Sequence, residues 1–293
     1  MDAGAKFNFM NQIQVNEVGP RDGLQNIDTI LNIGERLQLI QSLERAGINS
    51  LEVGSFVNPK AVPAMDNTDA LLEKLVNSNS DYSVLIPNIY GYELAKINKV
   101  KEVCLVLCAT ESMNKENINK SIKDTIVEFK EIINRAKKDQ IRTKIYISVA
   151  FECPYEGLVS SKYIYNLTKE FLSYGINEVV IADTIGAGNP EQVKKLFRLL
   201  VKDFGSSKFS AHFHDTRQLA LSNVKAAMEE GISKFDSCIA GLGGCPFAPG
   251  ASGNLATEDL VSMLHQEGYE TGISEEMLKK SIDLVSNFIN LKN

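Results

Sequence analysis

The residues best suited to chemistry are His212 and His214, two of the only three histidines in the chain. If their segment is a β-strand, side chains at positions i and i+2 point to the same face, so both imidazoles project into the same space. Imidazole nitrogens are common ligands of divalent metals, and buried ring nitrogens need partners. The spacing therefore favours a metal site, with two structural histidines as the alternative.

A carboxylate from the other end of the chain can complete such a site. Asp22 lies in the string Pro20-Arg21-Asp22-Gly23, directly after a β-rich segment. Taken alone, Asp22 is typical of a turn, but beside two imidazoles it offers a hard oxygen ligand. Mixed nitrogen and oxygen ligands suit Mg²⁺ or Mn²⁺, with Zn²⁺ also possible. The adjacent Arg21 either orients a substrate carboxylate and stabilises an enolate oxygen, or forms a structural salt bridge to Glu17 or Glu52.

The glycine-rich segment 240–253 contains a third candidate, Cys245. Small neighbours allow close backbone approach, and a thiol in such a loop is suited to donate or accept a proton. A buried loop cysteine is the alternative interpretation. A rival functional hypothesis combines Cys238 and Cys245 with the two histidines as a zinc site. It is less favoured, because a strand face and a loop tip need not converge and because Asp22 would then have no role.

The elements that must position these residues are short β-rich segments alternating with longer amphipathic helical patterns. Helical patterns cover, for example, 34–46, 118–137, 162–174, 190–202 and 217–230, and Gly47, Gly175 and Gly231 stand where C′ glycines end helices before a strand. This alternation predicts parallel strands with crossover helices. The eight candidate strands are 13–18, 50–53, 82–86, 102–107, 144–149, 178–181, 208–214 and 234–239.

Eight such units predict an α/β fold of the (β/α)8 TIM-barrel type. At 293 residues the chain has a length typical of one such domain. We expect a single catalytic domain over 1–293, with the barrel over about 12–250 and a C-terminal extension of helices over about 255–291. Active sites of these barrels lie at the carboxyl ends of the strands, which is where the candidate residues fall.

Composition excludes several classes of protein. The net charge is −6, from 31 basic and 37 acidic residues spread along the chain, which disfavours nucleic-acid binding. No apolar stretch reaches the roughly 20 residues of a membrane helix, and residues 1–14 show no targeting pattern. Five cysteines are an odd number without the density of a disulfide framework. We therefore expect a cytoplasmic protein that binds neither nucleic acid nor membranes.

Three strings carry a resemblance to a known family: 18–26 (VGPRDGLQN), 212–216 (HFHDT), and 241–246 (GLGGCP) followed by 250–259 (GASGNLATED). They resemble the 3-hydroxy-3-methylglutaryl-CoA lyase family, over about residue 12 to the C-terminal region. The resemblance implies cleavage of this acyl-CoA to acetyl-CoA and acetoacetate with Mg²⁺ or Mn²⁺ as cofactor, and it suggests a homodimer.

The resemblance also implies roles at matching positions. Asp22, His212, His214 and Asn254 would hold the metal. Cys245 would be the catalytic thiol, closing over the site with its loop, and protonation through His212 is the other route. Arg21 would stabilise the enolate and Glu52 would lie near the metal and the substrate hydroxyl. Further substrate contacts would come from Gln25, Ser55, Asp183 and Thr184.

The sequence departs from the family pattern at two places. Arg217-Gln218 stands where well-studied members have Tyr-Gly, and Glu152 stands where a glycine precedes Cys-Pro. Both changes add charge near the predicted mouth, so a lyase acting on another 3-hydroxy-3-carboxymethyl acyl-CoA is an alternative. Two further alternatives are a Claisen-condensing synthase of the isopropylmalate or citramalate type and a non-catalytic metal-binding barrel.

Overall fold

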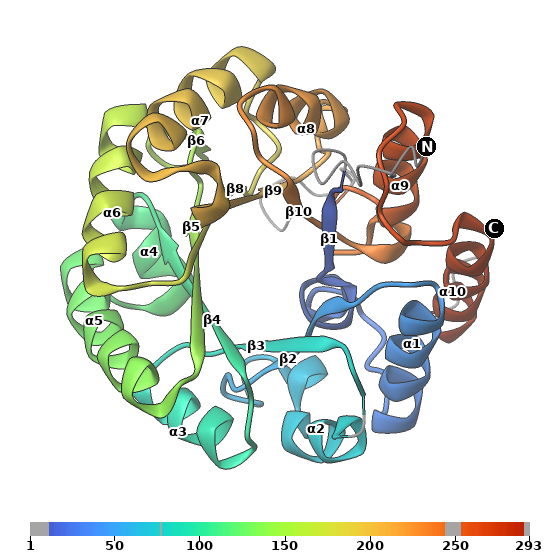
Figure 1. Cartoon of the computed structure of the whole chain (residues 1–293). Helices are drawn as coiled ribbons and strands as arrows, with labels where there is room; N and C mark the ends of the chain where they lie inside the picture. Colours follow the sequence, from blue (N-terminus) through green and yellow to red (C-terminus); the bar gives the residue numbers. More distant parts are fainter. Residues whose placement is uncertain (1–11, 77, 244–252, 290–293) are drawn as a thin grey trace, which may run out of the picture.

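A computed structural model of the chain describes residues 12–76, 78–243 and 253–289. Within these residues, eight parallel strands close into a barrel in the order β1-β10-β9-β8-β5-β4-β3-β2, and helices surround it (Figure 1). The predicted (β/α)8 barrel is confirmed. Its strands are β1 (Gln14–Glu17), β2 (Ser50–Ser55), β3 (Asp81–Leu85), β4 (Glu102–Cys108), β5 (Arg142–Ser148), β8 (Glu178–Asp183), β9 (Phe209–Phe213) and β10 (Lys234–Ser237).

The surrounding helices follow the strands in sequence. They are α1 (Ile33–Arg45), α2 (Thr68–Leu75), α3 (Ile89–Ile97), α4 (Glu111–Ile118), α5 (Ile122–Asp139), α6 (Ser161–Tyr174), α7 (Pro190–Phe204) and α8 (Ala220–Glu229), with α9 (Thr257–Gln266) and α10 (Glu275–Phe288) after the barrel. The sequence did not single out α2, α3 or α4. Nor did it indicate the small hairpin of β6 (Glu152–Cys153) and β7 (Gly157–Leu158), which follows β5.

Local sequence signals explain where helices begin and end. Asn32 and Asn189 begin α1 and α7 with reciprocal capping boxes, in which the asparagine side chain and the N3 side chain each accept a backbone N–H. Gly47, Gly175 and Gly231 have φ values of +99°, +93° and +87°, as expected of residues that end a helix in the left-handed region. A side chain at Gly47 would also collide with the Gly272 carbonyl, where α1 meets the segment before α10.

Strand register positions the residues of interest. β10 pairs with both β1 and β9, so Asp236 stands beside Asn16 on one side and beside His212 on the other. The first and last strands of the barrel thus meet at the β1–β10 seam. None of the helices in the described ranges has the length and apolar character needed to span a membrane.

Candidate active site

Asp22, His212 and His214 converge at the carboxyl ends of the strands. One ligand atom from each residue lies within 4.8 Å of the others, and the two imidazole centroids are 5.3 Å apart. His212 is on β9, His214 follows that strand, and Asp22 belongs to a turn after β1. The structure therefore has the convergence that the sequence predicts for these three residues, while their roles stay predictions.

The Asp22 turn is a five-residue π-helical segment, Gly19–Gly23. Three backbone amides, those of Arg21, Asp22 and Gly23, donate to the Val18 carbonyl, which folds the chain sharply at the end of β1. Gly23 has no room for a side chain, because a Cβ atom there would lie 2.5 Å from the Cys238 sulfur. The tight turn directs Asp22 across β10 towards the histidines.

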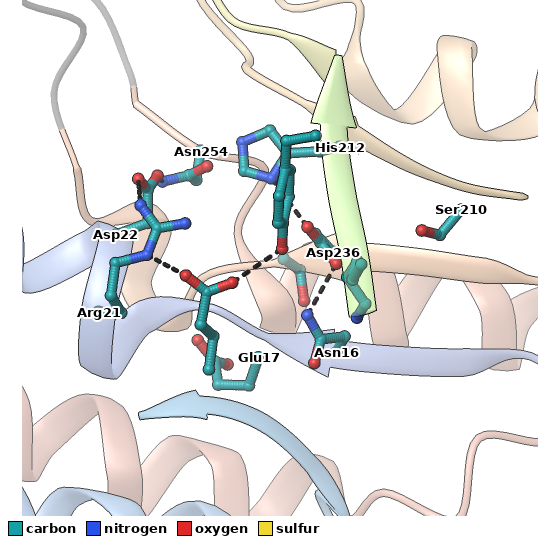
Figure 2. Close-up of polar contacts among 12 residues, drawn as sticks. Asn16, Glu17, Arg21, Asp22, Ser210, His212, Asp236 and Asn254 are labelled. Atoms are coloured by element: carbon teal, nitrogen blue, oxygen red, sulfur yellow. Dashed lines mark hydrogen bonds and ion pairs between the residues drawn. The ribbon is translucent and has the colours of Figure 1, made fainter. Parts of the chain in front are cut away.

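The chemistry of this cluster fits a divalent cation. Two buried polar atoms beside Asp22, His214 Nδ1 and Asn254 Oδ1, have no hydrogen-bond partner among the described residues. Asn254 is held in place because its Nδ2 donates to Asp22 Oδ2 over 2.8 Å and to the Leu242 carbonyl over 3.0 Å (Figure 2). Buried polar atoms without partners are costly, and a cation coordinated by these atoms would satisfy them.

The charge states of the cluster also suit a cation. Burial alone would raise the pKa of Asp22, but the Arg21 guanidinium and the two histidines hold it well below its usual range. Burial, together with the neighbouring His212, lowers the pKa of His214 to about 4. The carboxylate is therefore ionised and the His214 imidazole neutral at neutral pH, which are the forms that bind metals.

Arg21 is held by two carboxylates. Its guanidinium pairs with both Asp22 and Glu52, and its side chain is 6% exposed. The structural salt bridge considered from sequence therefore exists, and its partner is Glu52. The other Glu52 oxygen accepts the Tyr146 hydroxyl over 2.9 Å. Tyr146 also packs edge-on against the His212 ring, with centroids 5.9 Å apart. Sequence reasoning missed Tyr146, since a tyrosine within an apolar strand is typical of the core.

These residues open onto a cavity of about 590 Å³. The cluster and its neighbours form part of the lining. The segments around α3 and α4 form another part, which includes the polar side chains of Asn117 and Lys120. The volume suits a small-molecule ligand. The lining includes the predicted residues Arg21, Asp22, Gln25, Thr184, His212 and His214, together with Cys108 and Tyr146.

Four other predicted residues are not on this lining. Glu52 lies behind Arg21, and Asn254 lies behind Asp22. Ser55 is buried, and its hydroxyl has no hydrogen-bond partner among the described residues. The Asp183 carboxylate accepts the backbone amides of Ala187 and Gly188, and burial raises its pKa to about 6. Asp183 therefore shapes the loop after β8, and its contact with a substrate stays a prediction.

Cys245 lies outside the described residues. The described ends of its loop, Gly243 and Gly253, meet each other, since a Cβ atom at Gly253 would lie 1.9 Å from the Gly243 carbonyl oxygen. Gly243 has a φ of +94°, and a Cβ there would lie 2.7 Å from Asn254 Nδ2. Glycine at both positions brings the base of the loop against the cluster. The other cysteine of the zinc hypothesis, Cys238, is buried and is not part of the described cluster.

Asp236 is a further residue that sequence reasoning missed. Its Oδ2 lies 3.1 Å from His212 Nδ1, and its side chain is 1% exposed. Burial alone would lower the pKa of His212, but the hydrogen bond and charge of Asp236 outweigh burial and raise it. One ring nitrogen of His212 is thus engaged on the side away from the cluster.

The fold and the site together define a (β/α)8-barrel enzyme with, at the mouth of its barrel, a cluster of side chains that could hold a divalent cation. The chain belongs to the HMGL-like family, whose model matches residues 12–285. Its relatives place it among the carbon–carbon lyases.

Three of those relatives illustrate the similarity. The hydroxymethylglutaryl-CoA lyase of Pseudomonas mevalonii is 40% identical over 91% of this chain and 89% of that protein. A 3-hydroxy-3-isohexenylglutaryl-CoA/hydroxymethylglutaryl-CoA lyase of Pseudomonas aeruginosa is 38% identical over 92% of this chain and 91% of that protein. The structure of an HMG-CoA lyase from Acinetobacter baumannii in complex with coenzyme A and 3-methylmalate superposes with a TM-score of 0.92 at 35% identity, over 96% of this chain and 92% of that one.

Proposed function

We propose that this protein is a divalent-metal-dependent lyase that cleaves 3-hydroxy-3-methylglutaryl-CoA to acetyl-CoA and acetoacetate. The observation that carries the proposal is the convergence of Asp22, His212 and His214 within 4.8 Å at the mouth of the barrel. The similarity to hydroxymethylglutaryl-CoA lyases over nine-tenths of the chain supports it.

Asp22, His212, His214 and Asn254 would hold the cation, which we propose to be Mg²⁺ or Mn²⁺. When bound, such a cation polarises substrate oxygen atoms and lowers the pKa of a coordinated hydroxyl. The oxygen ligands of Asp22 and Asn254 favour these hard cations over a thiolate-rich zinc site.

Arg21 and its partners prepare the site for the charge that develops in the reaction. Loss of the hydroxyl proton allows the bond between C2 and C3 to break, which leaves acetoacetate and the enolate of acetyl-CoA. The Arg21 guanidinium lines the cavity and can stabilise the enolate oxygen. Glu52 pairs with Arg21 and accepts the Tyr146 hydroxyl, so the guanidinium is fixed and needs little reorganisation when the charge forms.

Cys245 would supply the proton that converts the enolate carbon to the methyl group of acetyl-CoA. Gly243 lies at the cluster and Cys245 follows it by two residues, so chain length allows the thiol to reach the enolate. His212 is less suited to this step. Its Nδ1 is bound to Asp236 and its other ring nitrogen would be a ligand of the cation, so His212 would present no proton to the enolate.

A second candidate substrate has specific support. The Pseudomonas aeruginosa relative is named for both the isohexenyl and the methyl substrate, at nearly the same identity as the relatives named for the methyl substrate alone. The two departures from the family pattern, Glu152 and Arg217, lie within 3.5 Å of each other, and Arg217 also donates to the Ala187 carbonyl. This pair joins the β6–β7 hairpin to the loops after β8 and β9, and neither residue is among those that line the cavity. The name of the Pseudomonas aeruginosa relative therefore carries this second candidate.

Cleavage between C2 and C3 releases acetyl-CoA from every 3-hydroxy-3-carboxymethyl acyl-CoA thioester. A coupled assay for acetyl-CoA over a panel of these thioesters, from methyl to isohexenyl, therefore tests both candidates. We expect activity with Mg²⁺ or Mn²⁺, none in excess EDTA, and recovery when the metal is returned. Cys245→Ser should lose at least about 10²-fold in kcat, whereas Cys153→Ser, which keeps the hydrogen bond from Thr110, should retain activity. Full activity of the stripped protein in EDTA would remove the proposal.

Two further measurements test the remaining alternatives. Release of free CoA from acetyl-CoA and a 2-oxo acid would support a Claisen-condensing synthase. Metal binding without turnover of any thioester would support a non-catalytic barrel. Neither result is expected, because the relatives compared above are named as lyases.

We further propose one catalytic domain over the whole chain, a homodimer and a cytoplasmic location. The closed barrel supports the first of these, as does the packing of α10 against α1. The dimer and the location rest on the family resemblance and on composition. Cooperative unfolding in a single transition and light scattering at twice the mass of 32.3 kDa would be the expected results.

A further inference from the structure

A row of polar side chains on neighbouring strands leads to His212. Strand register places Asn16 of β1 beside Asp236 of β10, and Asp236 beside His212 of β9. Asn16 Nδ2 donates to Asp236 Oδ1 over 2.8 Å, and Asp236 Oδ2 lies 3.1 Å from His212 Nδ1 (Figure 2). Ser50 at the start of β2 donates to Asn16 Oδ1 over 2.8 Å. We call Ser50, Asn16, Asp236 and His212 the polar row.

The direction of each hydrogen bond in the row follows from Asp236. An ionised carboxylate only accepts hydrogen bonds, so the hydrogen between Asp236 and His212 belongs to Nδ1 of the imidazole. In a neutral imidazole the free electron pair is then on Nε2. The edge of Tyr146 packs against the same ring. Both the tautomer and the orientation of His212 are therefore set by groups outside the cation cluster.

Asn16 in turn determines how Asp236 is held. The Asp236 carboxylate is buried on β10, where an unpaired oxygen would be costly. Asn16 occupies one oxygen and leaves the other for His212. Asn16 is itself oriented, because its amide oxygen accepts the Ser50 hydroxyl.

We propose that Asp236 and Asn16 are positioning residues for His212. Asp236 holds the Nδ1–H tautomer of His212, which leaves the Nε2 electron pair free to bind the cation. Asn16 holds the Asp236 carboxylate in the orientation that accepts the Nδ1–H. The inference rests on the proposed function for the cation, but the tautomer belongs to the metal-free protein as well. Loss of such a partner typically weakens metal binding by about 10- to 100-fold.

The two histidines are unequal in this respect. His214 Nδ1 has no hydrogen-bond partner among the described residues, whereas His212 Nδ1 is bound to a buried carboxylate. Among the described residues, only His212 therefore has its Nδ1 oriented by a hydrogen bond before a cation binds. Variants of the row should affect His212 and leave the tautomer of His214 unchanged.

The first experiment reads the tautomer directly. Because the chain has only three histidines, ¹⁵N-histidine labelling gives few ring signals, and His265→Gln and His214→Gln variants assign them. In metal-free protein at alkaline pH, we expect protonated Nδ1 and unprotonated Nε2 for His212. In Asp236→Ala this preference should be lost. A wild-type His212 protonated on Nε2 would overturn the proposal.

The second experiment measures Mn²⁺ affinity by electron paramagnetic resonance of the free ion. We expect Asp236→Ala to bind about 10- to 100-fold more weakly. Asp236→Asn keeps an acceptor and should recover part of the loss. Asn16→Val should show a smaller loss, because Asp236 remains but is no longer held. Ser210→Ala is the matched control, because Ser210 lies two residues before His212 on β9 and donates to Glu178, outside the polar row. This variant should bind Mn²⁺ as tightly as the wild type does.

The outcomes separate this inference from the proposed function. Absence of Mn²⁺ binding in the wild type would contradict the proposed cofactor, while the tautomer measurement would still decide the role of Asp236. Wild-type affinity in folded Asp236→Ala would overturn the positioning role. If Asp236→Ala does not fold, Asp236→Asn and Asn16→Val decide the question, and wild-type affinity in both would overturn it.

Discussion

The two ends of the barrel both bury charged side chains but treat them differently. At the amino-terminal end, the Lys144 ammonium lies 3.7 Å from Glu102 and 3.5 Å from Glu178. Glu178 also accepts from Lys234 over 2.6 Å and from Ser210 over 2.9 Å. At the mouth, Arg21 is paired, but His214 Nδ1 and Asn254 Oδ1 are buried without partners among the described residues.

This difference separates charges that stabilise the fold from the charges that we propose bind a ligand. Burial alone would lower the pKa of Lys144, yet Glu102 and Glu178 raise it, so its charge is balanced within the protein. Glu102 Oε1 has no hydrogen-bond partner among the described residues, but it lies 3.3 Å from the Arg142 guanidinium. The cluster at the mouth is satisfied only when something is added. In (β/α)8 barrels the first end is associated with stability and the second with catalysis. Four predictions test whether this separation holds.

The largest effect is expected from Asp22→Ala. Removing the carboxylate from the cluster should lower lyase kcat/KM by about 10³-fold, because transition-state stabilisation by a cation amounts to several kcal/mol. Mn²⁺ binding should be lost as well, measured by electron paramagnetic resonance. Asp28→Ala, an exposed position in the loop that follows, is the control and should behave as the wild type. Retained activity would place the reaction away from the mouth.

The next effect concerns the opposite end of the barrel. Lys144→Met keeps the length of the side chain but leaves the buried Glu178 and the half-buried Glu102 without its charge, so the free energy of unfolding should fall by about 3 kcal/mol. Urea unfolding measures this. Lys234→Met should cost less, because Lys234 is 29% exposed against 5% for Lys144. If Lys144→Met has unchanged stability but loses Mn²⁺ affinity, the two ends of the barrel do not have separate roles.

A pH dependence should arise from Glu17, the last residue of β1, whose carboxylate contacts the loop after β10. Its carboxylate accepts from Gly19 N, Ile239 N and the Thr257 hydroxyl, and burial raises its pKa to about 7. The folded protein then keeps a proton that the unfolded chain releases above about pH 4.5. The stability contribution of this group should therefore fall by up to about 3 kcal/mol as the pH rises from 4.5 to above 7.

Glu17→Gln isolates that contribution, since the amide has the same shape and does not titrate. As the pH rises from about 4.5 to above 7, the unfolding free energy of the wild type should fall relative to that of Glu17→Gln. Denaturant unfolding at pH 5, 6, 7 and 8 measures it. A difference that does not change with pH would show that Glu17 titrates normally.

The smallest effect is expected at Gln218, one of the departures from the family pattern. Its φ of +57° is in the left-handed region, which costs non-glycine residues about 1 kcal/mol. Gln218→Gly should therefore raise the free energy of unfolding by up to about 1 kcal/mol without changing turnover of the methyl substrate. Gln140→Gly is the matched control, because Gln140 has a φ of +59° at the end of α5; it should give a similar gain. Gln25→Gly would be a poor comparison, because Gln25 lines the cavity.

Much of the fold could be predicted because its signals are local. Strand periodicity, helix caps and the glycines at 47, 175 and 231 are each readable within about ten residues, and all eight barrel strands were predicted. The helices α2 and α4 were not singled out, since each has only eight residues. The small β6–β7 hairpin has two residues in each strand, too few to show a pattern.

The site was predictable only in part, for a physical reason. The spacing of His212 and His214 and the position of Asp22 at a strand end indicate a common cavity, so these three could be found without a resemblance. Asn254 was found only through the family motif, whereas Cys245 was already a candidate from its glycine-rich loop and received its catalytic role from the motif. Asp236 and its partner Asn16 were missed, because their hydrogen bond joins strands 220 residues apart and depends on register, which no single segment contains.

The seam between β1 and β10 has a consequence for kinetics. A cation coordinated by Asp22 and Asn254 would bridge residues 232 positions apart, so it would act as a reversible cross-link between the first and last parts of the barrel. Such a link forms only after the ring of strands has closed. We therefore expect bound Mn²⁺ to slow the unfolding rate while leaving the refolding rate unchanged, which would make the lifetime of the native state depend on how much of the metal is available.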